Sequence, residues 1–459
     1  MVIPVLHLAQ TRLTLTADAV AAIRYLTSEP EIPPDTGLRI ASASVDGPAA
    51  SPELSISGGP LPHDEVVEAG GVRVYLEPSV APHAPWLVLP LAHQQRDLGF
   101  DAWAAGQRAR MRVVVIGATG NVGTSVVSAL AADPGVTSIL GLARRLPDWH
   151  PDKTAWQMLD VATDDLAPHL RGADAVVHLA WLFQPTRNPR TTWRANALGS
   201  LRVFDAVARS QVPVLVYASS VGAYSPGPKD TPVTEDWPTH GWPMAAYGRE
   251  KAYVERALDV FERDHPAVRV VRLRPGFIFK REAATEQRRL FAGPFLPHQL
   301  VRPGLVPFVP DTPGLRFQAL HADDAAQAYR LSVTKPVSGP FNIAADPIVE
   351  PRVLADLLDA RLVPAPEWLL HGAAAVAWHM RLVPASPGLL EMLLHLPIMD
   401  TTRARTELGW APAHTAVEAI QELLEGTRAA ADMDTPPLSS RTSGPGRVRE
   451  FLTGVGQRA

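Results

Sequence analysis

Tyr247 and Lys251 lie four residues apart and are the residues whose types and spacing best fit acid–base chemistry. On a helix this spacing places both side chains on one face. A neighbouring ammonium group favours the phenolate and so lowers the phenol's ordinary pKa of about 10. The pair can then exchange a proton with an alcohol or ketone. Such pairs also occur on surface helices, but a strand expected over 213–218 precedes this one and ends in Ser219-Ser220, where a hydroxyl can bind the substrate oxygen.

A glycine-rich turn with Gly117, Gly120 and Gly123 follows an apolar strand expected over 113–116 and opens a helix. The first glycine permits a tight turn, the second lets the backbone approach a pyrophosphate, and the third allows close helix packing. The helix N-terminus attracts phosphates. In this strand–turn–helix context the motif predicts a dinucleotide site, and a purely structural turn is the alternative.

The group that reads the cofactor ribose is expected about 20 residues after the third glycine, where a site that prefers NAD carries Asp or Glu. This chain has Arg144 and Arg145 there. Guanidinium groups pair with phosphate oxygens, so the sequence favours NADP over NAD, with solvated surface arginines as the alternative. Asp160 ends the next strand, where it either contacts the adenine or is a surface residue.

Short apolar strands and helices alternate from Met111 onward. Strands are expected over 112–116, 138–142, 173–179, 213–218 and 268–273, and helices over 121–132, 191–209 and 247–265. This alternation is typical of a parallel sheet covered on both faces. We therefore predict an α/β fold, a Rossmann-like doubly wound parallel sheet with a small C-terminal substrate lobe, preceded by a small N-terminal β-rich domain.

The motifs of the C-terminal three-quarters of the chain resemble those of the extended short-chain dehydrogenase/reductase family, in particular of its NAD-dependent epimerase/dehydratase branch. The resemblance covers about residues 111–426. It rests on GATGNVG, VVHLA at 176–180, NALGS, YASSVGAY at 217–224, YGREK, LRPG at 273–276, LHADDAAQA at 320–328, FNIA at 341–344 and MDTTRARTELGW at 399–410.

The resemblance implies that Ser220 polarises the substrate, with Ser219 as the alternative register. It implies that Tyr247 is the acid/base, that Lys251 binds the ribose and tunes the phenol, and that Asn196 supports the lysine. The cofactor-binding positions that it implies, together with the arginines above, are Gly117, Thr119, Gly120, Asn121, Val122, Gly123, Arg144, Arg145, Asp160, Val161, Leu179, Ala180, Asn196, Tyr247, Lys251 and Pro275.

Some positions depart from the sugar-nucleotide members of the family. Phe277 stands near the point where those enzymes carry an Asn that holds the diphosphate, and Trp181 and Phe183 stand where smaller or more polar residues are common. These aromatics either line an apolar pocket or pack as core. We expect an NAD(P)-dependent oxidoreductase that transfers hydride between nicotinamide and an alcohol or ketone carbon. The alternatives are an epimerase or dehydratase that recycles its bound cofactor, and a non-catalytic dinucleotide sensor.

Residues 1–93 resemble the A-type iron–sulfur carriers in pattern, over about 13–91. That family binds iron or clusters through cysteines, and this chain has none. We therefore expect a degenerate domain that serves as a structural or protein-interaction module. A linker over 94–110, the enzyme domain over 111–430 and a disordered tail over 431–459, rich in Pro, Ser, Gly and Arg, complete the predicted organisation.

Composition limits the remaining functions. The chain has 459 residues, 46% hydrophobic and 20% charged, with a net charge of −4. This balance indicates neither a nucleic-acid nor a membrane partner. The absence of cysteine excludes thiolate catalysis and cysteine-ligated metal sites, and we expect no metal. We expect a cytoplasmic enzyme with a small-molecule substrate, and a homodimer as the assembly.

Overall fold

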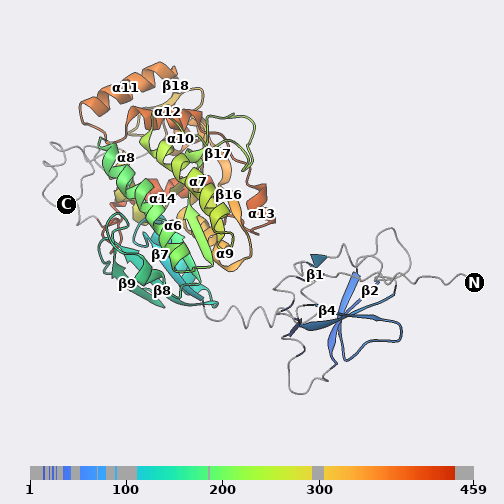
Figure 1. The fold of residues 1–459 in the computed structure, drawn as a ribbon. Helices are drawn as coiled ribbons and strands as arrows, with labels where there is room; N and C mark the ends of the chain where they lie inside the picture. Colours follow the sequence, from blue (N-terminus) through green and yellow to red (C-terminus); the bar gives the residue numbers. More distant parts are fainter. Residues whose placement is uncertain are drawn as a thin grey trace, which may run out of the picture. The chain divides into compact units, whose positions relative to one another are not determined.

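The computed structural model describes residues 14–15, 20, 23–24, 27, 35–42, 52–69, 71–78, 88–89, 111–184, 187–291 and 304–439. The chain divides into two compact units, Met1–Arg108 and Ala109–Ala459, and each is described by itself (Figure 1). The predicted linker over 94–110 lies outside the described residues. In the described segments, no helix combines the length and apolar character needed to cross a membrane.

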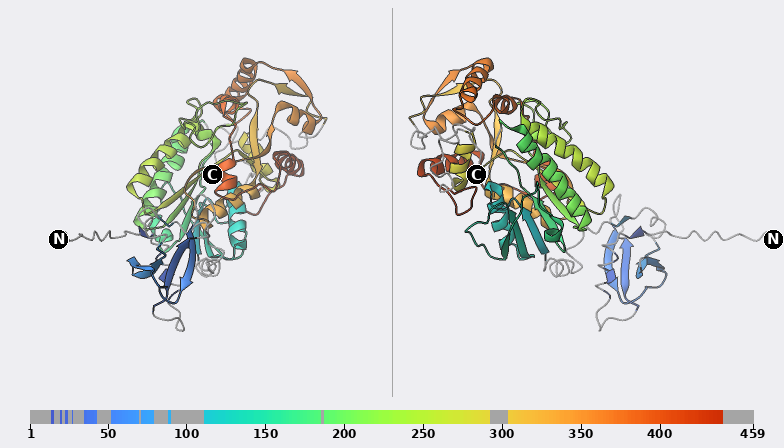
Figure 2. Two further views of the ribbon diagram at one scale, coloured as in Figure 1. Left: turned by 90° about the vertical axis from the view of Figure 1, so that its right-hand side faces the viewer. Right: turned by 60° about the vertical axis from the view of Figure 1, so that its left-hand side comes forward.

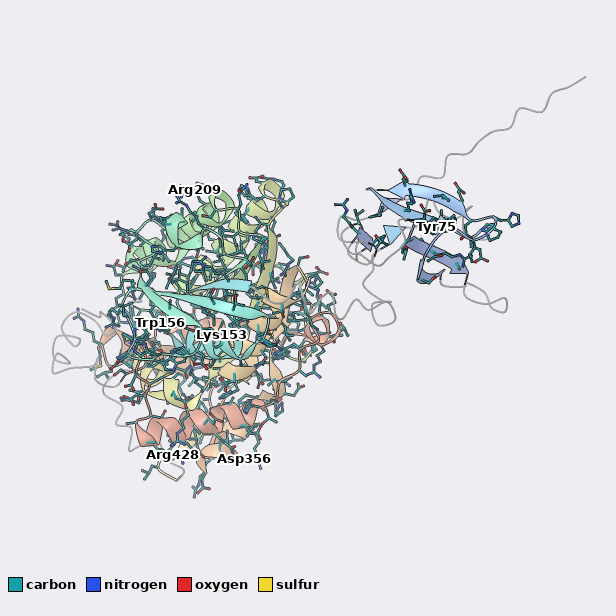
Figure 3. All side chains as sticks on the ribbon, turned by 90° about the horizontal axis from the view of Figure 1, so that it is seen from below. Tyr75, Lys153, Trp156, Arg209, Asp356 and Arg428 are labelled. Carbon is teal, nitrogen blue, oxygen red and sulfur yellow. The ribbon has the colours of Figure 1, made fainter. Side chains whose placement is uncertain are left out.

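The N-terminal unit is built on a four-stranded sheet in the order β3-β2-β5-β4. The strands of this unit are β1 (Thr14–Leu15), β2 (Gly37–Ser42), β3 (Pro52–Ser57), β4 (Glu65–Ala69), β5 (Val72–Leu76) and β6 (Val88–Leu89). Leu38 and Ile40 of β2 lie opposite Val74 and Leu76 of β5, and all four are buried, as alternation along a strand allows. Tyr75, labelled in Figure 3, is buried. Its hydroxyl donates to the carbonyl of Asp35. The predicted small β-rich domain is confirmed.

The larger unit contains a seven-stranded sheet in which every neighbouring pair runs parallel. Its order is β16-β12-β11-β10-β7-β8-β9. Its strands are β7 (Met111–Ile116), β8 (Val136–Ala143), β9 (Thr154–Met158), β10 (Ala175–His178), β11 (Val214–Ala218), β12 (Arg269–Pro275) and β16 (Gly339–Ile343). The first six strands follow the Rossmann order, and the direction of winding reverses between β7 and β10. The predicted Rossmann-like fold is confirmed, and the reversal marks where such sheets bind ligands.

Helices cover both faces of this sheet (Figure 2). Successive side chains of a strand point to opposite faces, so Val113 and Val115 pack with α3 (Asn121–Ala132) and α9 (Ala322–Thr334). Val114 and Ile116 pack with α6 (Gly199–Arg209) and α7 (Ala246–Asp264). Burial on both faces explains why the β7 sequence is a continuous apolar run.

The remaining elements form connections and the C-terminal lobe. They are α4 (Ala167–Leu170), α5 (Pro189–Trp193), η2 (Arg194–Leu198), η3 (Val221–Ala223), β13 (Phe277–Phe279), η4 (Arg281–Ala283), α8 (Ala284–Phe291), β14 (Phe308–Asp311), β15 (Phe317–His321), β17 (Ala345–Val349), α10 (Pro351–Leu358), β18 (Arg361–Pro364), α11 (Glu367–His379), α12 (Pro387–His395), α13 (Thr402–Thr406) and α14 (Ala416–Ala429). Helices α11 and α12 contact each other (Figure 1).

The helix expected over 191–209 is interrupted. It consists of α5, a π-helical turn η2 and then α6. The turn η2 contains Asn196, whose side chain hydrogen-bonds to the segment after β10 and to α7. Such π turns often accompany functional sites. The strand before Asp160 is β9, which ends two residues earlier, at Met158.

Residues 431–439, called here the terminal strap, are ordered, which corrects the prediction of a disordered tail for this part. Thr435 and Leu438 are fully buried. The Thr435 hydroxyl donates to the Thr119 carbonyl (2.9 Å), and the Asp148 amide donates to the Asp434 carbonyl (3.1 Å). The amino-acid composition of this segment, which predicts disorder, does not reveal such contacts with distant residues. Residues 440–459 lie outside the described residues.

Candidate active site

The glycine turn between β7 and α3 is tightly packed on its protein side and open on the other. Gly117 has φ of +87°, and a Cβ there would lie 2.6 Å from the Ala180 amide nitrogen. A Cβ at Gly123 would lie 2.3 Å from the Gly117 carbonyl oxygen, so the helix approaches the turn closely. At Gly120 the nearest atom would be 3.8 Å away. This open space at Gly120 would let the protein backbone come close to a pyrophosphate, as the sequence motif predicts.

The first turn of α3 is suited to phosphate. Gly120 is its N-cap, no side chain caps it, and no acidic residue lies in the first turn. The Asn121 side chain donates to the Ile278 carbonyl (3.1 Å), while its own Oδ1 is buried without a partner. Unsatisfied amides at a helix N-terminus attract anions. The residues here therefore fit the diphosphate of a dinucleotide.

The other predicted cofactor positions lie along the carboxyl edge of the sheet. Arg144 is exposed and Arg145 half-buried, directly after β8. The Asp160 side chain accepts a hydrogen bond from the Ala162 amide (2.9 Å). The remaining members are Val122 in the first turn of α3, the buried Val161 after β9, Leu179 and Ala180 after β10, and Pro275 at the end of β12.

Ser220 and Ser219 have different partners, which separates the two registers left open by the sequence. Ser220 lies beside the Tyr247 phenol, and its Oγ accepts from the Gly222 amide (3.0 Å). The Ser219 hydroxyl donates to Glu255 (2.5 Å) and is buried. A Cβ on Gly222 would lie 2.7 Å from the Tyr247 ring, so this glycine lets the phenol approach the serine. The geometry favours Ser220 over Ser219 as the hydroxyl beside the phenol.

Burial dominates the ionisation of both Tyr247 and Lys251. It raises the pKa of Tyr247 to about 12, with the Ser220 hydrogen bond opposing and the charge of Glu250 adding to the effect. Burial also lowers the pKa of Lys251 well below its usual range. The Lys251 Nζ donates to the Ala218 carbonyl (2.6 Å) and lies 3.4 Å from the Trp181 ring centroid. The expected lowering of the phenol's pKa by the lysine is therefore not seen in this structure.

Asn196 joins three elements around the lysine. Its Oδ1 accepts from the Leu182 amide (2.6 Å), and its Nδ2 donates to the Leu182 carbonyl (2.8 Å) and to Glu250 (2.7 Å). The other Glu250 oxygen accepts from Thr192 (2.6 Å), and burial raises the pKa of this carboxyl. Asn196 thus holds the neighbour of Lys251 and the segment after β10, and its described bonds do not include Lys251.

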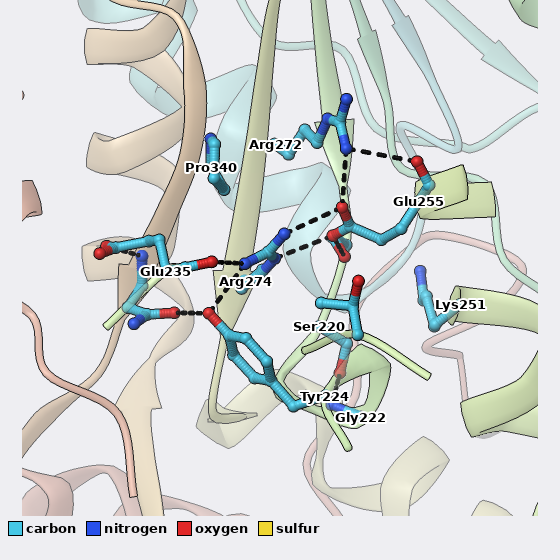
Figure 4. A network of polar contacts seen from close by, with 12 residues as sticks. Ser220, Gly222, Tyr224, Glu235, Lys251, Glu255, Arg272, Arg274 and Pro340 are labelled. Carbon is cyan, nitrogen blue, oxygen red and sulfur yellow. Dashed lines mark hydrogen bonds and ion pairs between the residues drawn. The ribbon is translucent and has the colours of Figure 1, made fainter. Parts of the chain in front are cut away.

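A buried ion network, which the sequence reading missed, connects the serine strand to α7 and β12 (Figure 4). Glu255 accepts from Ser219, from Arg274 Nε (2.9 Å) and Nη2 (3.0 Å), and from Arg272 Nη1 (3.0 Å). Arg274 also donates to the Tyr224 hydroxyl (2.9 Å). Burial alone would raise the pKa of Glu255, but the two arginines lower it to about 2. The network sets the distance between the Ser219-Ser220 turn and the helix of Tyr247.

A cavity of about 170 Å³ opens beside Tyr247. It is lined by Trp181, Leu182, Phe183, Pro189, Thr192, Met244, Ala246, Tyr247, Arg249, Glu250, Trp378, Ser386 and Leu389. The walls come from the segment after β10, from α5, from α7 and from the C-terminal lobe. The phenol, the serine and the phosphate turn therefore all lie at the carboxyl edge of the sheet, with this cavity next to the phenol.

A sequence profile of the NAD dependent epimerase/dehydratase family matches residues 113–344, just over half of the chain. The chain belongs to this family of enzymes, whose Rossmann-like fold binds NAD(P).

The 3-diazoavenalumate denitrifying reductase of a Streptomyces species is 28% identical over 324 residues, 66% of this chain and 97% of that protein. The L-arabinose 1-dehydrogenase (NAD(P)(+)) of Haloferax volcanii is 30% identical over 190 residues, 38% of this chain and 70% of that protein. The UDP-glucose 4-epimerase of Thermus thermophilus, solved with NAD, has a TM-score of 0.52 at 21% identity, covering 70% of this chain and 100% of that one. This last likeness concerns the fold alone.

Proposed function

We propose that the enzyme is an NAD(P)-dependent oxidoreductase that transfers hydride between a nicotinamide and an alcohol or ketone carbon. The observation that carries the proposal is the placement of the Ser220 hydroxyl beside the Tyr247 phenol, with Lys251 buried nearby and a cavity bordering the phenol. A hydroxyl that binds the reacting oxygen and a phenol that exchanges its proton are the two groups that carbonyl reduction requires.

In the reductive direction, the carbonyl carbon accepts a hydride, which the dinucleotide supplies when bound. The oxygen accepts a hydrogen bond from Ser220 and the proton of Tyr247. The products are an alcohol and the oxidised cofactor, and solvent returns the proton to the phenolate. Lys251, when protonated, would favour that phenolate by its charge, against the burial that raises the pKa of the phenol.

The cofactor proposed is NADP(H) in preference to NAD(H). The turn from Gly117 to Gly123 and the first turn of α3 would hold the diphosphate, and Lys251 would hold the nicotinamide ribose. Arg144 and Arg145 follow β8 at the position that reads the adenosine ribose, and neither Asp nor Glu occupies it. Two guanidinium groups suit a 2′-phosphate better than two hydroxyls. Competitive titration tests this preference, and tighter binding of NAD(H) would contradict it.

The cavity supports an oxidoreductase over a dehydratase. An elimination needs a further acid or base beside the phenol. Among the described residues that line the cavity, Glu250 is the carboxylate, and both of its oxygens already accept hydrogen bonds, from Thr192 and Asn196. This commits Glu250 to holding its neighbours in place.

The N-terminal unit is proposed to be a degenerate relative of the A-type iron–sulfur carriers that acts in protein interaction. Its mixed four-stranded sheet and the lack of any cysteine in the chain support a retained scaffold without cluster ligands.

The direct test replaces Tyr247 by Phe, which keeps the ring and removes the ionisable oxygen. Turnover should fall about 10²–10⁴-fold, as expected for a lost general acid, while NADP(H) affinity stays near normal. Single-turnover hydride transfer, followed by nicotinamide absorbance with a panel of ketones and alcohols, measures the effect. Near-normal hydride transfer in Tyr247→Phe would refute the proposed role.

A further inference from the structure

Aromatic rings surround the phenol on the cavity side. The Trp181 ring meets the Tyr247 ring edge-on at 5.8 Å between centroids, and the Phe183 ring lies 5.1 Å from it. Phe183 is held in turn by Phe291, at 5.0 Å. Trp378 of α11 closes the cavity from the C-terminal lobe. Rings at these separations and angles attract one another, so the walls are preformed for another flat ring.

The size of the cavity fits one ring. Its volume is about 170 Å³, below the roughly 300 Å³ at which pockets for drug-sized ligands begin. An apolar protein cavity of about 150 Å³ is known to accept benzene. A nucleotide diphosphate linked to a sugar is several times larger than one ring. The walls therefore match a small flat group next to the reacting carbon.

The charges around the cavity do not favour a diphosphate. Arg249 is the one cation among the described lining residues, and its guanidinium donates to the Pro243 carbonyl. Arg187 stacks on the Trp378 ring at 4.2 Å and donates to the Trp378 carbonyl. A bound diphosphate needs several convergent cations or amides. The described walls offer instead aromatic faces, Met244 and Leu389.

We infer that the substrate is a ketone or alcohol whose reacting carbon carries a single aromatic ring, and that Phe183 and Trp378 determine this specificity. The inference rests on the proposed oxidoreductase function for the identity of the reacting group. The ring enters between Phe183, Trp181 and Trp378, which leaves the carbonyl oxygen at Ser220 and Tyr247. Reduction moves one hydride to the carbonyl carbon and one proton to its oxygen, as above.

The test compares two methyl ketones that differ in the second substituent, acetophenone and butanone, with UDP-glucose as a third probe. With NADPH, kcat/KM for acetophenone should exceed that for butanone by at least about tenfold, because the ring adds apolar area and aromatic contacts. UDP-glucose should neither bind nor turn over. Similar kcat/KM values for the two ketones, or preferred binding of UDP-glucose, would overturn the inference and leave the oxidoreductase function standing.

Variants locate the preference. Phe183→Ala and Trp378→Ala should each reduce the acetophenone-to-butanone ratio about threefold to tenfold. Trp368→Ala is the matched control, because Trp368 lies on the same helix α11 but is 73% exposed and outside the cavity. Unchanged NADPH affinity verifies folding, and Phe183→Leu provides a second variant that keeps a large apolar side chain but removes the ring, which should also reduce the ratio. A ratio that none of the cavity variants changes would overturn the assignment.

A binding measurement separates failure of the inference from failure of the proposed function. Ligand-observed NMR reports acetophenone binding to the full-length protein with and without Phe183→Ala, independently of turnover. If no carbonyl is reduced but acetophenone binds in a Phe183-dependent manner, the proposed reaction is wrong and the ring site stands. If acetophenone does not bind, the inference is wrong whatever the protein catalyses.

Discussion

Glu255→Gln is the substitution that most directly tests how the buried ion network supports the site. The carboxylate is fully buried and accepts hydrogen bonds from Ser219, Arg272 and Arg274. Glutamine keeps the shape and removes the charge. Arg274 then loses its ion pair with Glu255 and keeps its hydrogen bonds to the Tyr224 hydroxyl and the Glu235 carbonyl.

The magnitude follows from the pKa of Glu255. Burial acts to raise it, but the arginines lower it from the ordinary 4.5 to about 2, which corresponds to about 3 kcal/mol of stability at neutral pH. Breaking a buried ion pair on one side costs about 3–5 kcal/mol, in agreement. Because the folded pKa lies below the unfolded one, this stability is present above pH 4.5 and is lost as the pH falls toward 2.

Denaturant unfolding from pH 7 down to pH 3 measures both effects. The free energy of unfolding of Glu255→Gln should be about 3 kcal/mol lower than that of the wild type at pH 7, and the difference should shrink below about pH 4.5. Glu262→Gln is the control, because Glu262 bonds Arg272 from a side chain that is 33% exposed, and it should cost less than about 1 kcal/mol. Equal stability of Glu255→Gln and the wild type at pH 7, or a difference that does not change with pH, would refute the argument.

Three further outcomes are expected. Ser220→Ala should lower kcat about tenfold or more with little change in thermal stability, because it removes a hydrogen bond to the reacting oxygen. Ser219→Ala should mainly lower the free energy of unfolding, by about 1–3 kcal/mol. Steady-state kinetics and thermal unfolding of both variants measure these effects, and the reverse pattern would exchange the two roles. Replacing Arg144 and Arg145 together by Ala should weaken NADP(H) binding at least tenfold, because each charged hydrogen bond contributes about 1.5–3 kcal/mol, and leave NAD(H) within about twofold in calorimetry; equal losses would argue against 2′-phosphate recognition. The full-length protein purified without oxygen should contain no iron–sulfur cluster by iron analysis and visible absorbance, and a stoichiometric cluster would disprove the proposed degeneracy.

The parts of the site that local sequence predicted are those that depend on local backbone geometry. Gly117 has a positive φ and Gly123 touches the turn, so only glycine fits at either position, and the motif is visible in the sequence. The four-residue spacing of Tyr247 and Lys251 lies within one helix and is equally readable.

The parts that the sequence did not reveal depend on contacts between distant elements. In the sequence Glu255 looks like any polar residue of a helix. Its ion pairs exist only because β12 places Arg272 and Arg274 beside it in the fold. Trp378 lies 131 positions after Tyr247, and no spacing rule connects it with the cavity. The pKa of Tyr247 was expected to be lowered by its neighbour, but burial, which only the folded chain determines, acts in the opposite direction.

The terminal strap contacts the cofactor turn, so the turn is synthesised long before the segment that completes its contacts. Thr435 bonds a residue that lies 316 positions earlier, in the cofactor turn. Chains are made from the N-terminus at about 5–20 residues per second, so the turn leaves the ribosome well before its partner exists. Until the terminal strap emerges, the Thr119 carbonyl lacks its bond to Thr435, and the site that Leu438 fills remains uncovered. In this enzyme the bond between Thr435 and the cofactor turn can therefore form only after residues 431–439 have been synthesised.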